Sequence, residues 1–176
     1  TCLLNLGIVS IRIGDPERAR SYLEEALAAA RDLQEVRTEA LVLQNLAELQ
    51  VADGDHEAGR CLLLQSLGIF HEAQDLRLLA LVLAQLGRVA SAAGDSLRGF
   101  RLLAAATGLR RTIGAVPRPD QQREEDALAA AARAALGEAA AEQVWSEWRV
   151  KSLAEVLEYA TAATATASPR PARFRG

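Results

Sequence analysis

The sequence predicts an all-α fold: a right-handed solenoid of stacked helix pairs, closed by a helical cap at its C-terminal end. The chain of 176 residues is 50% hydrophobic but only 4% aromatic. Its apolar side chains are mostly Ala and Leu, which favour helices over strands. A Gly-Asp dipeptide recurs with a constant 40-residue period, at Gly14-Asp15, Gly54-Asp55 and Gly94-Asp95. A fixed period of this length is typical of repeat proteins, in which each unit covers the apolar face of its neighbour.

Each 40-residue unit is predicted to be a helix, a tight turn and a second helix. In the first unit, Leu3, Leu6 and Ser10 fall on one helical face. Gly14 ends this helix because glycine tolerates the left-handed backbone, and Asp15 caps the next helix. The same pattern returns one and two periods later. The predicted helices span residues 2–13, 16–33, 37–52, 56–73, 76–92 and 96–113.

The period breaks after the third unit, and the following segment is predicted to be a terminal cap. A Pro-containing connector leads to Asp120, which is expected to cap a helix over residues 121–136. A second helix is expected over 138–149, and a capping box from Ser152 to Glu155 opens a third. The predicted regions are repeats over 1–114, a helical cap over 115–160 and a flexible tail or linker over 161–176.

Composition and charge exclude several classes of protein. The net charge of −3 is not the strongly basic balance of a nucleic-acid-binding domain. The three arginines of the tail, Arg170, Arg173 and Arg175, are too few to predict direct nucleic-acid contact. No apolar run approaches the length of a membrane span, and no secretory signal opens the chain. Because the first unit starts in mid-pattern at Thr1, we expect the chain to be a piece of a longer protein.

No residue set predicts an enzyme, a cofactor site or a metal site. The chain lacks a Gly-x4-Gly-Lys-Ser/Thr phosphate loop and a GxGxxG motif. His56 and His71 are predicted on one helix about 22 Å apart, too far to share a metal ion. With only two cysteines, Cys2 and Cys61, a disulfide framework is excluded, and a reducing, cytoplasmic setting is expected. Cys61 is interpreted as a packed or partly exposed small residue, the alternative being a reactive thiol.

Two further features have structural interpretations. Carboxylates are frequent and stand near arginines at helical spacing, as Glu24 and Arg20 do. Such pairs are interpreted as solvated helix surface. Trp145 and Trp148 stand at the spacing that places them on one face of a predicted cap helix. We interpret them as cap packing, with a partner-binding anchor as the alternative.

The repeat unit resembles the tetratricopeptide repeat. The resemblance rests on the pattern Leu-x2-Leu-Gly-x2-small, Gly-Asp and small-x3-Leu-x2-Ala, with equivalents one and two periods later. In the first unit these residues are Leu3, Leu6, Gly7, Ser10, Gly14, Ala19, Leu23 and Ala26. The Trp and Tyr usual in the first helix and the Pro that closes a unit are missing. The period also exceeds the family's usual length of about 34 residues. Units this long are similar to those in the sensor arms of large bacterial signal-transduction regulators.

The closing segment is similar to the one that ends the repeat array in bacterial LuxR-type and related STAND-class regulators. The matching residues are Leu109, Arg110, Arg111, Gly114, Pro117, Ala132, Arg133, Leu136, Gly137, Trp145, Arg149, Ser152, Leu153, Glu155, Tyr159 and Ala160. A Phe is usual where Ala141 stands, and a Gly where Trp148 stands. The resemblance implies a non-catalytic sensor or regulatory arm, with the ATPase and the DNA-binding or other output module outside this chain.

The resemblance also implies a binding surface on the concave side, formed by the first helix of each unit. The implied candidates are Ile8, Ile11, Arg12, Gln44, Glu48, Val51, Arg88 and Ser91. A clamp for a C-terminal carboxylate is disfavoured. Asn5 and Asn45 stand at a clamp-like position, but the paired lysines of such clamps are missing.

The expected partners are a protein or small-molecule effector on the concave face and the other domains of the parent regulator. Neither a membrane nor nucleic acid is expected to bind this piece directly. A structural scaffold or oligomerisation arm without a ligand of its own is the alternative, and it would form a homo-oligomer through an exposed apolar stripe.

Overall fold

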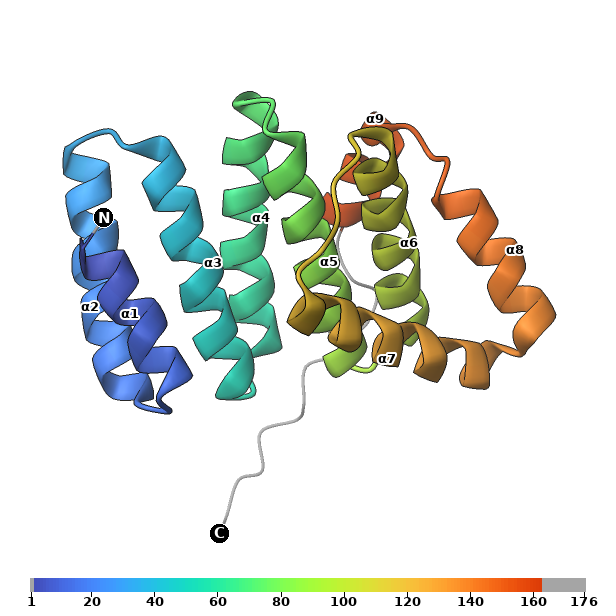
Figure 1. Cartoon of the computed structure of the whole chain (residues 1–176), viewed down its shortest axis with the longest axis horizontal. Helices are drawn as coiled ribbons and strands as arrows, with labels where there is room; N and C mark the ends of the chain where they lie inside the picture. Colours follow the sequence, from blue (N-terminus) through green and yellow to red (C-terminus); the bar gives the residue numbers. More distant parts are fainter. Residues whose placement is uncertain (1, 163–176) are drawn as a thin grey trace, which may run out of the picture.

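The computed structural model describes residues 2–162, and all regular secondary structure within this range is α-helical (Figure 1). The helices are α1 (Cys2–Arg12), α2 (Pro16–Asp32), α3 (Val36–Ala52), α4 (His56–Glu72), α5 (Leu76–Ala92), α6 (Ser96–Thr112), α7 (Pro119–Leu136), α8 (Glu138–Trp148) and α9 (Leu153–Thr161). The predicted bounds of α1–α6 are confirmed to within one residue. Within residues 2–162, no helix is long and apolar enough to cross a membrane. Most of the predicted tail, with its three arginines, lies outside the described residues.

Three helix pairs, α1–α2, α3–α4 and α5–α6, stand side by side and form the predicted all-α repeat solenoid (Figure 1). Gly14, Gly54 and Gly94 turn the chain within each pair, with φ angles of 77°, 86° and 93°. An L side chain rarely adopts such angles, which explains the glycine. The next residue caps the second helix in each pair: the carboxylates of Asp15, Asp55 and Asp95 accept backbone hydrogen bonds of 3.1, 2.9 and 3.0 Å.

The turns that link one pair to the next also follow the 40-residue period, without glycine at every step. Gln34 and Gln74 have positive φ angles of 56° and 53°, and Gly114 has 65° at the third equivalent position. Left-handed backbone is unfavourable for glutamine because its Cβ approaches the following carbonyl oxygen. These two turns are therefore strained relative to the turns within the pairs.

Small residues set the spacing between paired helices. A Cβ added to Gly87 on α5 would lie 2.9 Å from the carbonyl oxygen of Gly99 on α6, so two glycines allow close backbone contact. Larger side chains fill the core around this contact, and Phe70 and Phe100 are fully buried. Among the described residues, the buried apolar side chains form two clusters, one over α1–α3 and one from α3 to α9. Leu41 and Leu62 pack against both clusters, as expected for stacked units.

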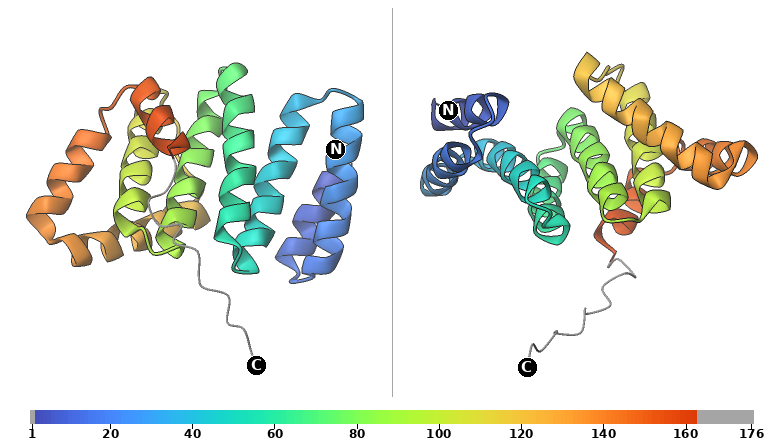
Figure 2. Two further views of the ribbon diagram at one scale, coloured as in Figure 1. Left: turned by 180° about the vertical axis from the view of Figure 1, so that it is seen from behind. Right: turned by 90° about the horizontal axis from the view of Figure 1, so that it is seen from below.

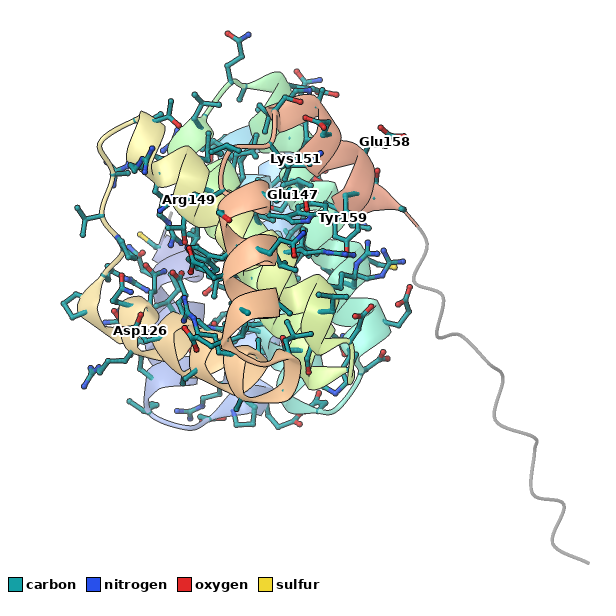
Figure 3. The ribbon with its side chains drawn as sticks, turned by 90° about the vertical axis from the view of Figure 1, so that its right-hand side faces the viewer. Asp126, Glu147, Arg149, Lys151, Glu158 and Tyr159 are labelled. Carbon is teal, nitrogen blue, oxygen red and sulfur yellow. The ribbon has the colours of Figure 1, made fainter. Side chains whose placement is uncertain are left out.

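The cap region departs from a simple continuation of the stack. α7 packs against α5 and α6 and crosses in front of them, while α8 and α9 cover α6 at the end of the array (Figures 1 and 3). Seen from below, α7 projects beyond the row of repeat helices (Figure 2). The expectation that Asp120 caps α7 is wrong. α7 begins at Pro119, whose fixed φ suits the first helical position, and Asp120 lies in the first turn.

Aromatic and arginine side chains join the cap to α6. The ring of Trp145 lies 5.1 Å from that of Phe100, and the ring of Trp148 lies 4.3 Å from that of Tyr159. The guanidinium of Arg133 lies over Phe100 and Trp145, and that of Arg101 lies over Trp148 and Tyr159. Both tryptophans are thus part of the packing between α8 and the end of the array.

The last helix is held at both ends. The capping box is confirmed: Ser152 accepts from the Glu155 backbone, and the Glu155 carboxylate accepts from the Ser152 backbone, at 3.4 and 3.0 Å. At the other end, the buried Arg98 of α6 donates to the carbonyl oxygens of Tyr159, Ala160 and Ala162 at 2.8–3.1 Å. A cation at a helix C-terminus stabilises these otherwise unpaired carbonyls. Arg98 thereby fixes α9 against the third unit.

Candidate functional site

The first helices of the second and third units each carry a stripe of mostly polar side chains on one face. On α3 the stripe is Arg37, Leu41, Gln44 and Glu48, and on α5 it is Arg77, Leu81, Gln85 and Arg88. Residues three or four apart lie above one another on a helix, so each stripe follows its helix axis. The two stripes border a groove between α3 and α5, which has α7 and the α6–α7 connector at its far edge.

The groove widens near the N-terminal ends of α3 and α5 into a hollow of about 410 Å³, which we call the arginine hollow. It is lined by Arg37, Asp75, Arg77, Leu78, Leu81, Arg110, Ala115, Val116, Pro117, Arg118 and Gln121. Four of these side chains are guanidinium groups and one is a carboxylate. Since the whole chain has a net charge of −3, this hollow is a local concentration of positive charge.

The four arginines of the hollow differ in how far their charge is already neutralised. Arg110 is buried and forms a paired contact with a carboxylate of α7. Arg37 lies 2.6 Å from Asp75, and Arg118 lies 3.4 Å from Asp120. Arg77 is exposed and has no carboxylate within ion-pair distance among residues 2–162. The charge of Arg77, and in part those of Arg37 and Arg118, therefore faces solvent in the hollow.

Farther along α3 and α5 the groove narrows to a cleft with room for about one water molecule. It is lined by Gln44, Ala47, Glu48, Val51, Leu63, Gln85, Arg88 and Val89. The side-chain oxygen of Gln85 is buried and accepts no hydrogen bond from any described residue. Arg88 forms an ion pair with Glu124, which joins α5 to α7 at this end. The cleft thus offers an unused acceptor beside one acidic and one basic side chain.

Four of the eight predicted concave-face residues, Gln44, Glu48, Val51 and Arg88, are brought together in this cleft. Gln44 is buried, and its Nε2 donates to the Ser66 hydroxyl at 3.3 Å, so its orientation is fixed from within the second pair. Glu48 is the most exposed of the four. These residues line the groove from α3 and α5.

The other four predicted residues lie elsewhere. Ile8, Ile11 and Arg12 are on α1, one unit before the groove, and both isoleucines are half-buried against the core. Ser91 lies on α5 beside Gly99 of α6, and its buried hydroxyl has no hydrogen-bond partner among the described residues. Ser91 therefore faces its paired helix rather than the groove.

The sequence prediction missed the arginine hollow. Arg37 and Arg77 are one repeat period apart, so the sequence marks them as equivalent positions. They stand one helical turn before Leu41 and Leu81, on the stripe that contains the predicted residues. Arg118 comes from the connector, and no periodic signal predicts that the connector returns to this face.

Several other candidates have positions that indicate structural roles. Asn45 donates to the carbonyl oxygen of Leu41 at 2.7 Å, so its amide is engaged within α3. Cys2 and Cys61 are exposed free thiols. Within residues 2–162, no group of three or more His, Cys, Asp or Glu side chains is placed to hold a metal ion. Beside Cys61, Glu57 forms a hydrogen bond with Arg60 that lowers the pKa of its carboxyl group.

Comparison with known proteins finds a family match over the first two helix pairs. Residues 1–72, which contain α1–α4, match the family model described as tetratricopeptide repeat. The match supports a tetratricopeptide-repeat domain, and α5–α6 continues the same 40-residue period. Searches of curated proteins and of solved structures found no match. Tetratricopeptide repeats generally mediate protein–protein interactions, and the solenoid offers an extended surface for them.

Proposed function

We propose that this protein is a non-catalytic module that binds an extended, acidic protein segment in the groove between α3 and α5. The observation that carries this proposal is that the arginine hollow and the narrow cleft are both lined by side chains of α3 and α5, the hollow near the N-terminal ends of these helices and the cleft farther along them. The binding residues would be Arg37, Arg77 and Arg118 in the hollow, and Gln85 and Glu48 in the cleft.

The dimensions and chemistry of the groove match such a segment. Arg77 and Arg88 are eleven positions apart on α5, or about 16 Å along the helix axis. An extended chain covers that distance with about five residues. Guanidinium groups bind carboxylates through paired charge-assisted hydrogen bonds. The cleft holds about one water molecule, which would bridge the buried Gln85 oxygen to a backbone N–H of a ligand lying above it. Leu78 and Leu81 supply apolar contact in the hollow.

The experiment is a fluorescence-anisotropy titration of the whole chain with two labelled decapeptides. One peptide carries four glutamates among leucines and serines, and the other has glutamine in place of each glutamate. We expect the glutamate peptide to bind more tightly, with an affinity that falls as salt is raised. Arg77→Glu should weaken binding at least about tenfold, because it replaces an attraction with a repulsion.

A matched charge reversal away from the hollow separates specific binding from a change in net charge. Arg123 is exposed on α7 and does not line the groove, so Arg123→Glu should leave the affinity nearly unchanged. Equal binding of the two peptides, or equal losses for Arg77→Glu and Arg123→Glu, would contradict the proposal.

The second part of the proposal is that the module serves as the sensor or regulatory arm of a bacterial LuxR-type or STAND-class regulator. It is supported by the resemblance of the closing segment and by the position of α7. Glu124 and Glu125 of α7 pair with Arg88 and Arg110, which line the cleft and the hollow. A ligand that competes for these arginines would shift α7 and so favour one arrangement of the array over another.

This regulatory role is tested in the parent protein. A phosphate-binding loop upstream, or a helix-turn-helix module downstream, in the open reading frame would support it. An unchanged response of the parent regulator to its inducers after deletion of α1–α9 would refute it, even if the isolated chain binds acidic peptides.

A further inference from the structure

An apolar face of α1 is exposed, whereas the equivalent faces of α3 and α5 are buried. Leu6 is 46% exposed and Val9 is 51% exposed. The equivalent residues one and two periods later are almost fully buried: Leu46 at 6%, Leu86 at 3%, Leu49 at 5% and Val89 at 6%. The residues compared are all apolar and stand at equivalent positions of their helices. The difference in their exposure therefore arises from what packs against each helix.

In the later units, the covering element is the second helix of the preceding pair. Leu46 shares a buried cluster with Leu23 of α2, and α2 packs against α3. Leu86 shares a buried cluster with Leu63 of α4, and α4 packs against α5. On α1, the corresponding face meets no helix among residues 2–162.

We propose that the Leu6–Val9 face of α1 is a docking surface for a further helix pair of the same repeat type. Its occupant is the second helix of that pair, an amphipathic helix with leucines at the spacing of Leu63 and Leu67, which share a buried cluster with residues of α5. The argument is continuity with two interfaces in this structure, α2–α3 and α4–α5, which join the same residue types in the same register. It does not depend on a ligand in the groove.

Cys2 provides a built-in reporter for this interface. It is exposed, whereas Val42 and Val82, the equivalent residues in the second and third units, are fully buried. A helix docked as α4 docks on α5 would therefore cover the Cys2 thiol. Cys61, on a different helix and also exposed, serves as the internal reference in the same sample.

The experiment appends a copy of residues 36–80 directly before Thr1 of the full chain, which continues the 40-residue period. The copy carries α3, α4 and the first turn of α5, with its own cysteine replaced by serine. Thiol labelling is followed by mass spectrometry, and amide hydrogen exchange in α1 is measured in parallel. We expect Cys2 labelling to slow by at least about tenfold and α1 exchange to slow with it, while Cys61 labelling is unchanged.

The matched control is the same fusion with Leu63→Glu and Leu67→Glu in the appended copy only. These changes remove the apolar surface of the covering helix, so Cys2 labelling should return to the rate of the unextended chain. Equal rates for Cys2 in both fusions would overturn the proposal. The proposal would also be overturned if, in the unextended chain, Cys2 labelling slowed as the protein concentration was raised. That result would show that a second copy of the chain occupies the face.

Discussion

Arg110 of α6 and Glu125 of α7 form a buried, two-pronged ion pair. The two guanidinium nitrogens donate to the two carboxylate oxygens at 2.6 and 2.8 Å, and the side chains are only 8% and 7% exposed. This pair holds α7 against the third repeat, at the back of the arginine hollow. Glu124, the residue before Glu125 in the same turn of α7, pairs with Arg88, and the side chains of Arg88 and Glu124 are 38% and 55% exposed.

We predict that Glu125→Ala destabilises the protein by about 3 kcal/mol or more, because Arg110 would remain buried without its counter-charge. The adjacent Glu124→Ala is the matched control and should cost less than about 1 kcal/mol, since exposed ion pairs contribute little. Urea unfolding followed by circular dichroism measures both values. Similar losses for the two variants would show that burial does not govern the contribution of this pair.

A second prediction concerns Gly108, where α6 meets the α8–α9 turn. A Cβ at this position would overlap the backbone carbonyl group of Arg149. Gly108→Ala should therefore displace the cap and cost about 1–3 kcal/mol, the usual range for overpacking. A lowered thermal unfolding midpoint and altered fluorescence of Trp145 and Trp148 would report this displacement.

Gly68 supplies the control for the glycine substitution. It also lies within a helix, α4, but a Cβ there would meet no atom within 4 Å. Gly68→Ala should leave the structure unchanged and raise stability by up to about 1 kcal/mol, because alanine favours the helix. The prediction for Gly108 is wrong if both substitutions change stability in the same direction.

A third prediction concerns the turns between helix pairs. Gln74 has a φ angle of 53°, and the equivalent position in the third unit is occupied by Gly114. Gln74→Gly should raise the free energy of unfolding by about 0.5–1 kcal/mol, since the relief of backbone strain exceeds the added entropy of the unfolded chain. The reverse substitution within a pair, Gly54→Gln, should lower it by about 1 kcal/mol. Chemical denaturation of the two variants tests both signs.

The fourth prediction concerns Glu155 and pH. The ammonium group of Lys151 donates to its carboxylate at 2.8 Å, and with two further hydrogen bonds from Ser152 this lowers the pKa of Glu155 from 4.5 to about 2. A depressed carboxyl pKa stabilises the fold above pH 4.5, and this contribution is lost as pH falls from 4.5 towards 2. NMR titration of the Glu155 side-chain carbon measures the pKa directly.

Two variants around the lysine sharpen the pH test. Lys151→Met removes the strongest partner and should raise the pKa of Glu155 towards its ordinary value. Glu147 lies 3.9 Å from the same ammonium group, near the α8–α9 turn (Figure 3), and Glu147→Gln should leave the Glu155 pKa nearly unchanged. An unaltered Glu155 pKa in Lys151→Met would contradict the assignment of its cause.

The sequence predicts the repeats well because their signals are local and recur three times. Gly14 acts through its own backbone conformation, and Asp15 acts through a hydrogen bond to a residue three positions away. The equivalent residues of each later unit give the same signal. The connector between α6 and α7 occurs once, so its sequence signals are not repeated elsewhere in the chain. Asp120 is expected as a cap from its residue type alone, whereas the fixed φ of Pro119 sets the start of α7.

Contacts between distant residues could not be predicted from spacing. Helical position pairs Arg20 with Glu24, but the Arg20 guanidinium lies 2.6 Å from Asp53 at the end of α3. The direction of α7 likewise depends on Arg88 and Arg110, which meet their carboxylates only after the chain has folded back. The arginine hollow was missed for the same reason: one of its walls is this returning segment.

The connector has a consequence for the size of the array. Gly114 repeats the left-handed turn of Gln34 and Gln74, so the chain leaves α6 with the geometry that begins a new unit. A helix that started at residue 116 would be equivalent to the helices that start at 36 and 76, and its residue 119 would correspond to Glu39 and Leu79. Each of these two residues donates its backbone N–H within the first turn, whereas Pro119 has no N–H to donate. Pro119 therefore ends repeat propagation after the third unit. Pro119 also starts α7, which crosses α5 and forms one edge of the groove, so one residue sets both the end of the repeats and the shape of the groove.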